Sequence, residues 1–286
     1  MAFPWQKLHV TVLGCGFMGT AILQGLFRDA KDGPEIRATA CVRSSTSIER
    51  AQKALAQHKD RITFQRNNFA EAAKDANVVM LGVPPDQLEA LLSEAGLVDA
   101  LRNKAIISLL AGVSTAQILQ ALAKEQDQRK QFHLVRVIPT IGAQYGDSLT
   151  LLADTDSAGK EEQAACEWLL NQIGAIQPIS EDLIDTATAV GAACNALSFL
   201  AIDAVVDGSV ADGLPRDTAL SLAAQSLRSA AGLACNGMSP ESIRAAMSIP
   251  RGITINSLLQ LERGQVRSGI SDSVRHAIAY TKGMSS

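Results

Sequence analysis

The chain has 286 residues, of which 47% are hydrophobic and 19% are charged, and its formal net charge is −3. This length allows one large domain or two of ordinary size, and the apolar content is sufficient for buried cores. The sequence contains no basic run with interleaved aromatic residues, which argues against a nucleic-acid-binding surface. We therefore expect a soluble globular protein whose partners are small molecules.

Cysteines and histidines are scattered without the spacing of a metal site or of disulfide pairs. We expect reduced, mostly buried thiols and no bound metal. The first ten residues, MAFPWQKLHV, contain no apolar signal core, so a cytoplasmic location is the default expectation. The alanine-rich stretch 184–206 carries Asp185, Asn195 and Asp203, which favours a helix packed in a core or a subunit interface over a membrane span.

In the N-terminal part, short apolar strands alternate with helical segments. The first predicted strand, 8–13, leads into a glycine turn, and a helix over 20–27 precedes a second strand at 37–42. Helical stretches are also predicted over 48–58 and 161–173. Further predicted strands begin at Ile62, Val78, Ala105, His133, Thr150 and Ala175. Strands that alternate with helices indicate a mostly parallel sheet.

Beyond about Ser180 the apolar residues recur at three- and four-residue spacing through to Tyr280, and no convincing strand is found. Helix breaks are predicted at 212–217, 236–242 and 248–254, where glycine and proline cluster. The sequence thus predicts an α/β domain over 1–180 and an all-helical domain over 181–286. A ligand often lies in the cleft of such a two-domain layout.

A glycine-rich loop follows the first strand directly and precedes the first helix. Gly14, Gly16 and Gly19 form a G-x-G-x-x-G pattern in the segment VTVLGCGFMGTA. In a Rossmann-like domain these glycines permit a tight turn, close approach of a pyrophosphate, and packing of helix on strand. We expect this loop, with Phe17 and Met18, to bind a dinucleotide, the latter two serving as packing residues; a glycine turn without a ligand is the alternative.

The end of the second strand indicates which dinucleotide is bound. An NAD site usually places an acidic residue there, about 20 residues beyond the glycines, for the ribose hydroxyls. Here Arg43 is followed by Ser44, Ser45 and Thr46. A guanidinium with hydroxyl groups suits a 2′-phosphate, so NADPH is favoured. The alternative is that Arg43 is a solvated surface residue.

Taken in order, the glycine loop and the segments VPPDQL, SLLAGVS, RVIPT, DGLPRDTAL and SIPRGIT resemble the pyrroline-5-carboxylate reductase family nearly end to end. The resemblance implies a Rossmann-like NADP-binding domain over 1–180 and a helical dimerisation and substrate domain over 181–286, with larger rings of dimers in some members. It implies NADPH-dependent reduction of 1-pyrroline-5-carboxylate to L-proline. Val83, Pro84 and Ala111 complete the candidate coenzyme residues.

The segment 248–254 is the candidate substrate site. Thr254 matches the family threonine that hydrogen-bonds the ring nitrogen, although spacing alone would make it a helix cap. Backbone amides of Gly252, Ile253 and Thr254 at a helix N-terminus could bind the carboxylate. Arg251 either pairs with that carboxylate or points into solvent. Asn195 is a second catalytic candidate, or else a satisfied interior polar residue.

The chain departs from the family pattern around the expected active site. The family's Lys-Pro, Met-Pro-Asn-Thr-Pro, Gly-Ser-Gly-Pro-Ala-Tyr and Ser-Pro-Gly-Gly stand here as Pro84-Pro85, 138–142 (IPTIG), 192–197 (AACNAL) and 249–252 (IPRG). Two alternatives to the family reaction follow. One is reduction of a related cyclic imine, such as a substituted pyrroline or a piperideine carboxylate, and the other is a catalytically silent NADPH-binding protein.

Overall fold

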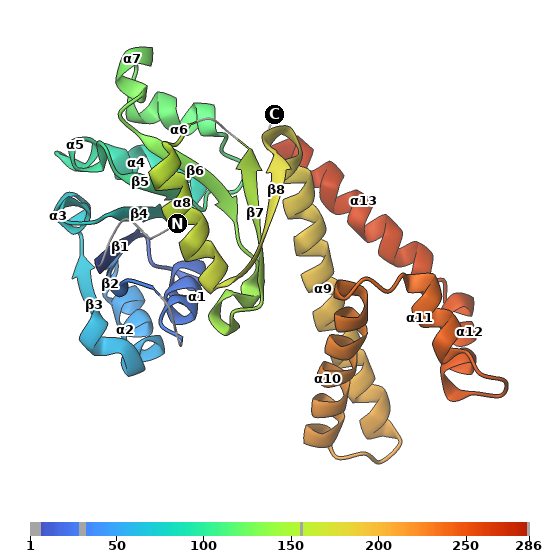
Figure 1. The fold of residues 1–286 in the computed structure, drawn as a ribbon. Coiled ribbons are helices and arrows are strands. Elements are labelled where there is room, and N and C mark those ends of the chain that lie inside the picture. Colours follow the sequence, from blue (N-terminus) through green and yellow to red (C-terminus); the bar gives the residue numbers. More distant parts are fainter. Residues whose placement is uncertain (1–6, 29–32, 155–156, 285–286) are drawn as a thin grey trace. The chain divides into compact units, whose positions relative to one another are not determined.

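The structure is a computed structural model that describes residues 7–28, 33–154 and 157–284 (Figure 1). The chain divides into two compact units, an α/β unit that extends to Thr188 and a helical unit from Ala189 to Gly283. The expected order, an α/β part followed by an all-helical part, is confirmed.

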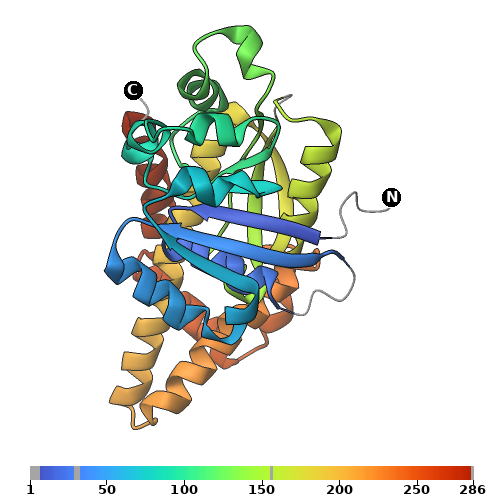
Figure 2. The ribbon, with the colours of Figure 1, turned by 90° about the vertical axis from the view of Figure 1, so that its left-hand side faces the viewer.

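One eight-stranded sheet forms the centre of the α/β unit, in the order β3-β2-β1-β4-β5-β6-β7-β8. Every strand pair is parallel except β6 with β7, so the expected mostly parallel sheet is confirmed. Figure 2 shows the strands on the β1 side of this sheet running alongside one another. The strands are β1 (Lys7–Leu13), β2 (Glu35–Val42), β3 (Ile62–Arg66), β4 (Val78–Leu81), β5 (Ala105–Ser108), β6 (His133–Ile138), β7 (Ser148–Asp154) and β8 (Gly174–Ser180).

Helices cover both faces of the sheet, which is why central strands such as VVML in β4 and AIIS in β5 are buried along their whole length. The helices and helical turns of this unit are α1 (Phe17–Leu26), α2 (Ser45–Ala54), η1 (Ala56–Arg61), α3 (Phe69–Lys74), η2 (Pro85–Gln87), α4 (Leu88–Leu92), α5 (Leu97–Leu101), α6 (Thr115–Leu122), α7 (Gln126–Arg129), η3 (Ile141–Tyr145) and α8 (Lys160–Gln172). The predicted helices over 20–27, 48–58 and 161–173 correspond to α1, to α2 with η1, and to α8.

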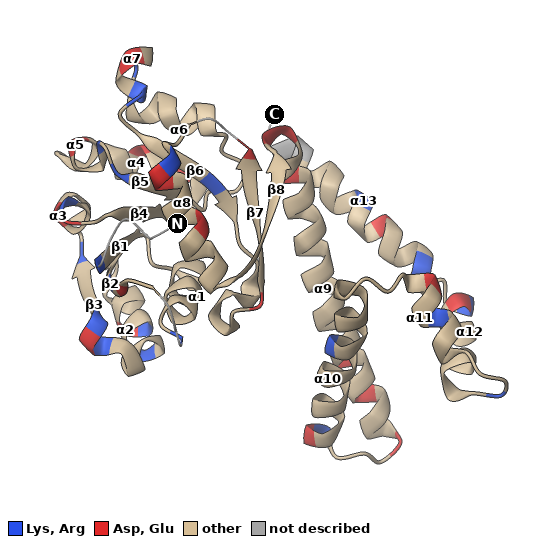
Figure 3. Cartoon of the chain, in the orientation of Figure 1, with Lys and Arg blue, Asp and Glu red and all other residues tan. Residues whose placement is uncertain are grey.

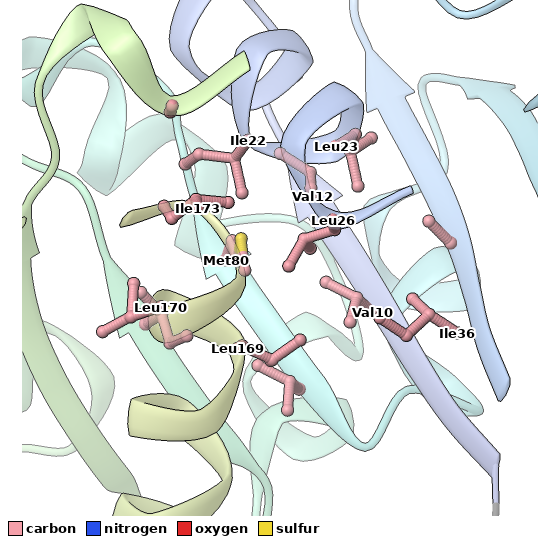
Figure 4. Close-up of a cluster of buried hydrophobic side chains, with 14 of the residues drawn as sticks. Val10, Val12, Ile22, Leu23, Leu26, Ile36, Met80, Leu169, Leu170 and Ile173 are labelled. Carbon is pink, nitrogen blue, oxygen red and sulfur yellow. The ribbon is translucent and has the colours of Figure 1, made fainter. Parts of the chain in front are cut away.

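The core divides at the sheet into two clusters, one on each face. The first contains side chains of β1, β2, α1 and α8, among them Val10, Ile22, Leu26 and Leu169 (Figure 4). The second lies under α3, α4, α5 and α6. Both clusters fix the sheet from which the predicted coenzyme loops extend.

A buried arginine in β6 anchors the start of α9 (Glu181–Ala211). The Arg136 side chain is only 1% exposed and donates to Asp185 Oδ1 at 2.6 Å and to Glu181 Oε1 at 3.4 Å. Glu181 Oε1 also accepts from the Thr115 backbone N–H, at the start of α6. A buried charge is costly unless it is paired. This network therefore ties the first two turns of α9 to β6 and α6.

The helical unit consists of the rest of α9 with α10 (Arg216–Cys235), α11 (Pro240–Met247), α12 (Ile253–Arg263) and α13 (Val266–Met284). Its buried apolar cluster is small and contains Val206, Ala219 and Ala223. α9 is long and apolar enough to cross a membrane by length and composition only, and Figure 3 shows no charged residue along its middle. Only 17% of its most apolar window is buried. The single chain therefore does not pack α9 into a core, and the subunit-interface interpretation of this helix is the one retained.

The expectation of free, mostly buried thiols is confirmed for three of the five cysteines. Cys15, Cys41 and Cys166 are buried and free, whereas Cys194 and Cys235 are free and exposed. The two exposed thiols lie in the helical unit, where much apolar surface is also uncovered.

Removal of the buried Leu169 side chain should destabilise the α/β unit. Leu169 is fully buried between α8 and the sheet, so Leu169→Ala is expected to cost about 2–5 kcal/mol of unfolding free energy through lost burial and a residual cavity. The measurement is urea unfolding followed by circular dichroism. Leu149→Ala is the matched control, because Leu149 is 46% exposed and should unfold near the wild-type midpoint. Equal midpoints for the two variants would contradict the packing described.

Candidate coenzyme and substrate sites

The carboxyl ends of β1 and β4 form a topological switch point. The chain passes from β1 outward to β2 and β3, and then returns to place β4 on the other side of β1. In open α/β sheets, ligands bind in the crevice at such a point, outside the carboxyl ends of the strands. The predicted coenzyme loop 14–19 lies directly beyond β1 at this edge.

Gly14 is held in a position that only glycine can occupy. Its φ is +86°, and a Cβ built on it would lie 2.6 Å from Val83 Cγ1 and 2.7 Å from the Val83 nitrogen. The Gly14 and Cys15 amides both donate to the Cys41 carbonyl, at 2.9 and 3.1 Å. The turn after β1 is therefore fixed against both neighbouring strands.

Gly16 and Gly19 have different roles in the same loop. A Cβ on Gly19 would lie 2.8 Å from Val12 Cγ1, so this glycine permits close packing of α1 on β1. A Cβ on Gly16 would meet nothing nearer than the Gly14 carbonyl oxygen at 3.9 Å, so space is open above it. Gly16 is the N-cap of α1 and makes no side-chain cap hydrogen bond. The first amides of α1 are thus left for an anionic ligand, and the loop fits a dinucleotide pyrophosphate.

The two apolar residues of the loop, Phe17 and Met18, differ in how far their side chains are buried. Met18 packs against the first core cluster, as expected. The Phe17 side chain is 67% exposed, so the expectation that it packs in the protein interior is wrong. As the first residue of α1, Phe17 presents its ring to solvent at the same edge as the open space over Gly16.

Cys15 lies within the glycine loop, but its thiol is buried and unreactive. Its thiol is 1% exposed, and burial raises its pKa to about 11, with the Thr20 hydroxyl 3.7 Å from Sγ acting in the opposite direction. A thiol with a raised pKa is almost entirely protonated at neutral pH, so Cys15 is not a nucleophile.

The Arg43 side chain is exposed at the end of β2. Its Nη1 donates to Gln87 Oε1 at 3.4 Å, and its guanidinium lies 5.7 Å from the centroid of the Phe69 ring. The Ser44 hydroxyl caps α2 by accepting from the Ser47 amide, and the first turn of α2 contains no acidic residue. Gln87 could not be predicted as a partner of Arg43, because the proximity of the two residues depends on how β4 and β2 are placed in the sheet.

The remaining coenzyme candidates lie at the same edge. Val83 and Pro84 follow β4 directly, and the Gly82 amide donates to the Leu13 carbonyl at 2.8 Å. Ala111 is exposed in the turn after β5. The structure therefore brings together all the predicted coenzyme residues, at the carboxyl ends of four neighbouring strands.

The proposed substrate segment begins α12. Gly252, not Thr254, is the N-cap residue of this helix, and no side chain caps it, so the helix-cap reading of Thr254 is wrong. Arg251 has a φ of +58°, and the Gly252 amide donates to the Ile249 carbonyl at 2.9 Å. That amide is consequently not free for a carboxylate. The amides of Ile253 and Thr254, in the first turn, are free of this turn hydrogen bond.

Several side chains at the start of α12 are available to a ligand. Ile253 is 86% exposed and Arg251 is exposed, and neither Arg251 nor Thr254 forms a side-chain hydrogen bond or ion pair with any residue that the structure describes. Ile253 and Thr254 lie at the first two helical positions.

Asn195 lies on α9, which Figure 1 shows apart from α12. Its side chain is half-buried and makes no hydrogen bond within the described residues. The alternative expectation, an interior polar residue whose hydrogen bonds are satisfied, is therefore wrong. Beside it, a cavity of about 410 Å³ between α9 and α13 is lined mainly by apolar side chains such as Leu197, Leu200 and Ile270. Its lining contains few polar side chains, Gln265 and Ser273 among them, and no charged one. Within a single chain, the structure does not unite Asn195 with Thr254.

Comparison with known proteins identifies both units. Residues 181–284 match the family model described as pyrroline-5-carboxylate reductase dimerisation, and residues 9–112 match the one described as NADP oxidoreductase coenzyme F420-dependent. A pyrroline-5-carboxylate reductase of Lophium arboricola is 32% identical, and the match covers 95% of this chain and 92% of that protein. The chain belongs to the pyrroline-5-carboxylate reductase family.

Other members of the pyrroline-5-carboxylate reductase family are similar to this chain over nearly its whole length. That of Schizosaccharomyces pombe is 32% identical over 96% of this chain and 98% of its own. The structure of the Coxiella burnetii enzyme has a TM-score of 0.77 at 25% identity, covering 97% of this chain and 98% of its own. The Plasmodium falciparum pyrroline carboxylate reductase, determined with NADP bound, has the same fold, with a TM-score of 0.79 at 20% identity over 98% of this chain and 99% of its own.

Membership in this family settles the class of protein. The fold is a Rossmann-like domain followed by a helical dimerisation domain, as the sequence predicts. The chain is a reductase, an NAD(P)H-dependent oxidoreductase of the class that acts on C=N bonds. The glycine loop described above is the candidate site for its nicotinamide coenzyme.

Two glycine substitutions should separate coenzyme binding from folding. Gly16→Ala adds a methyl group to open space, so it should leave the thermal midpoint near that of the wild type while weakening NADP(H) binding at least about tenfold. Gly14→Ala must move Val83 and strains a positive φ, so it should lower the thermal midpoint as well. The measurements are thermal unfolding and fluorescence titration with the coenzyme. Undiminished binding by Gly16→Ala would rule out this loop as the pyrophosphate site.

Proposed function

We propose that the protein reduces the C=N bond of 1-pyrroline-5-carboxylate to form L-proline, with NADPH as the hydride donor. The observation that carries this proposal is the near full-length similarity to enzymes named for that reaction, combined with a glycine loop that fits a dinucleotide. Residues 1–180 would bind the coenzyme, and residues 181–286 would provide the dimer contacts and the substrate residues.

The preference for NADPH rests on the end of β2. An NAD site would place a carboxylate there, whereas this chain presents the Arg43 guanidinium at the start of a helix without acidic residues in its first turn. A guanidinium forms bidentate hydrogen bonds with a phosphate group, and a carboxylate would repel it. NADPH is therefore the better electrostatic match.

The substrate residues would act by positioning and polarising the imine. The bound nicotinamide supplies the hydride, and a protonated imine is already electrophilic, so no protein nucleophile is needed. We assign the Thr254 hydroxyl to the imine nitrogen and the amides of Ile253 and Thr254 to the carboxylate, where the helix dipole also favours negative charge. Arg251, exposed one residue before the N-cap, adds a cation near that carboxylate, and Asn195 remains a candidate catalytic residue.

A homodimer formed through the helical unit accounts for its uncovered apolar surface. Exposed apolar residues in this unit include Phe199 (59%), Leu200 (69%) and Leu222 (56%). Apolar surface of this extent marks an interaction surface. The family model for these residues is one of dimerisation, so a second copy of the chain is the natural partner, and rings of dimers are an extension of it. A cytoplasmic location fits this metabolic role.

The purified protein should oxidise NADPH when given 1-pyrroline-5-carboxylate. The assay follows NADPH absorbance in the steady state, with piperideine carboxylates and substituted pyrrolines tested in parallel. We expect the highest kcat/KM with the unsubstituted five-membered imine. A higher value with another imine would assign the protein to that substrate instead, and NADPH binding without turnover of any imine would indicate a catalytically silent protein.

Substitution of Thr254 should affect the reaction without affecting the coenzyme. Thr254→Ala removes the hydroxyl assigned to the imine nitrogen, so kcat/KM for the imine should fall about tenfold or more, while the Kd for NADPH stays within about twofold. Thr254→Ser keeps the hydroxyl and is the matched control. Unchanged kinetics in Thr254→Ala would show that this residue is merely part of the α12 helix.

A further inference from the structure

A second arginine lies next to Arg43 at the carboxyl edge of the sheet. Arg66 is the last residue of β3, and its Cα is paired in register with that of Val42, the residue before Arg43. The pairing continues one residue further, because the Asn67 amide donates to the Val42 carbonyl at 3.1 Å. Adjacent strands are about 4.8 Å apart, so the two arginine backbones are near neighbours.

The two side chains emerge on opposite faces of the sheet. Alternate residues of a strand share a face, which places Arg66 on the face of Ile62 and Phe64, two residues that pack with the first core cluster. That cluster includes Leu55 and takes Ile48 of α2 against it. Arg66 is therefore on the α2 side.

Arg43 lies on the opposite face of the sheet, because its guanidinium lies over the ring of Phe69, a residue of α3 in the second cluster. The start of α2, directly after Arg43, thus has one arginine on each side.

Neither arginine has an acidic partner. Both are exposed, and no ion pair joins either of them to any residue that the structure describes. Arg37, at the opposite end of β2, is by contrast paired with Glu35 at 3.0 Å. Two nearby cations without a counter-charge repel each other. A bound anion would attract both of them, and this attraction would offset the repulsion.

We propose that Arg66 is a second ligand of the coenzyme's 2′-phosphate, on the opposite side of that group from Arg43. This proposal rests on the proposed use of NADPH. A phosphate monoester carries close to two negative charges and three acceptor oxygens at neutral pH, more than one guanidinium can satisfy. Arg66 thereby contributes to the discrimination between NADPH and NADH.

Binding measurements on the full-length protein test this role independently of turnover. Calorimetric titration with adenosine 2′,5′-bisphosphate, and fluorescence titration with NADPH and NADH, are compared for wild type, Arg66→Gln and Arg43→Gln. Arg66→Gln should weaken the bisphosphate and NADPH about tenfold and change NADH less than about twofold. Arg66→Lys should recover part of the loss. Arg37→Gln removes the same charge from the other end of β2 and should change none of the affinities.

The outcomes separate this proposal from the proposed function. If only Arg43→Gln weakens the bisphosphate, Arg66 is not a ligand and the proposal fails while NADPH use stands. If neither variant weakens it, both the role of Arg66 and the NADPH assignment at this edge fail. An equal loss of NADPH and NADH affinity in Arg66→Gln, or a lowered thermal midpoint, would assign Arg66 a structural role. Imine turnover bears on none of these results.

Discussion

The close contact between Gly14 and Val83 holds the carboxyl ends of β1 and β4 together at the predicted coenzyme site. With less than 3 Å from a built Cβ to the Val83 backbone, β1 and β4 meet at their carboxyl ends without any intervening side chain. The turn after β1 is held on its other side by two hydrogen bonds to the Cys41 carbonyl. Because this turn is fixed from both sides, the start of α1 is fixed as well, and the space beside Gly16, its N-cap residue, is open. The candidate coenzyme residues, from Gly14 to Ala111, lie after the carboxyl ends of the strands around this junction.

Much of this arrangement is local in the sequence and could be predicted. The glycine spacing after an apolar strand indicates the loop, and continuous apolar runs such as VVML indicate strands buried on both faces. Contacts that depend on strand order could not be predicted. Arg136 looks like any polar residue in a strand, yet it is buried against Glu181 and Asp185 about 45 residues later. The pairing of Arg66 beside Val42 likewise appears only once β3 is placed next to β2.

The errors at the candidate substrate site have physical causes. Thr254 has the residue type of a helix cap, but the chain turns at Arg251 with a positive φ and then extends at Gly252, so the helix begins two residues earlier than a threonine cap requires. This leaves the hydroxyl without a partner in the described part of the chain, as a ligand-binding group would be. Asn195 and much of the apolar surface of the helical unit are incompletely covered for a related reason. The helical unit matches a family model of dimerisation, so we infer that a partner chain covers part of this surface.

We propose, above all, that a hydride passes from NADPH to the imine carbon of 1-pyrroline-5-carboxylate. The most direct test supplies the purified protein with this imine and with NADPH dideuterated at C4 of the nicotinamide ring, and examines the product by mass spectrometry and NMR. The account predicts proline that carries a single deuterium at C5. Proline without deuterium, or no proline while the coenzyme is bound, would contradict it.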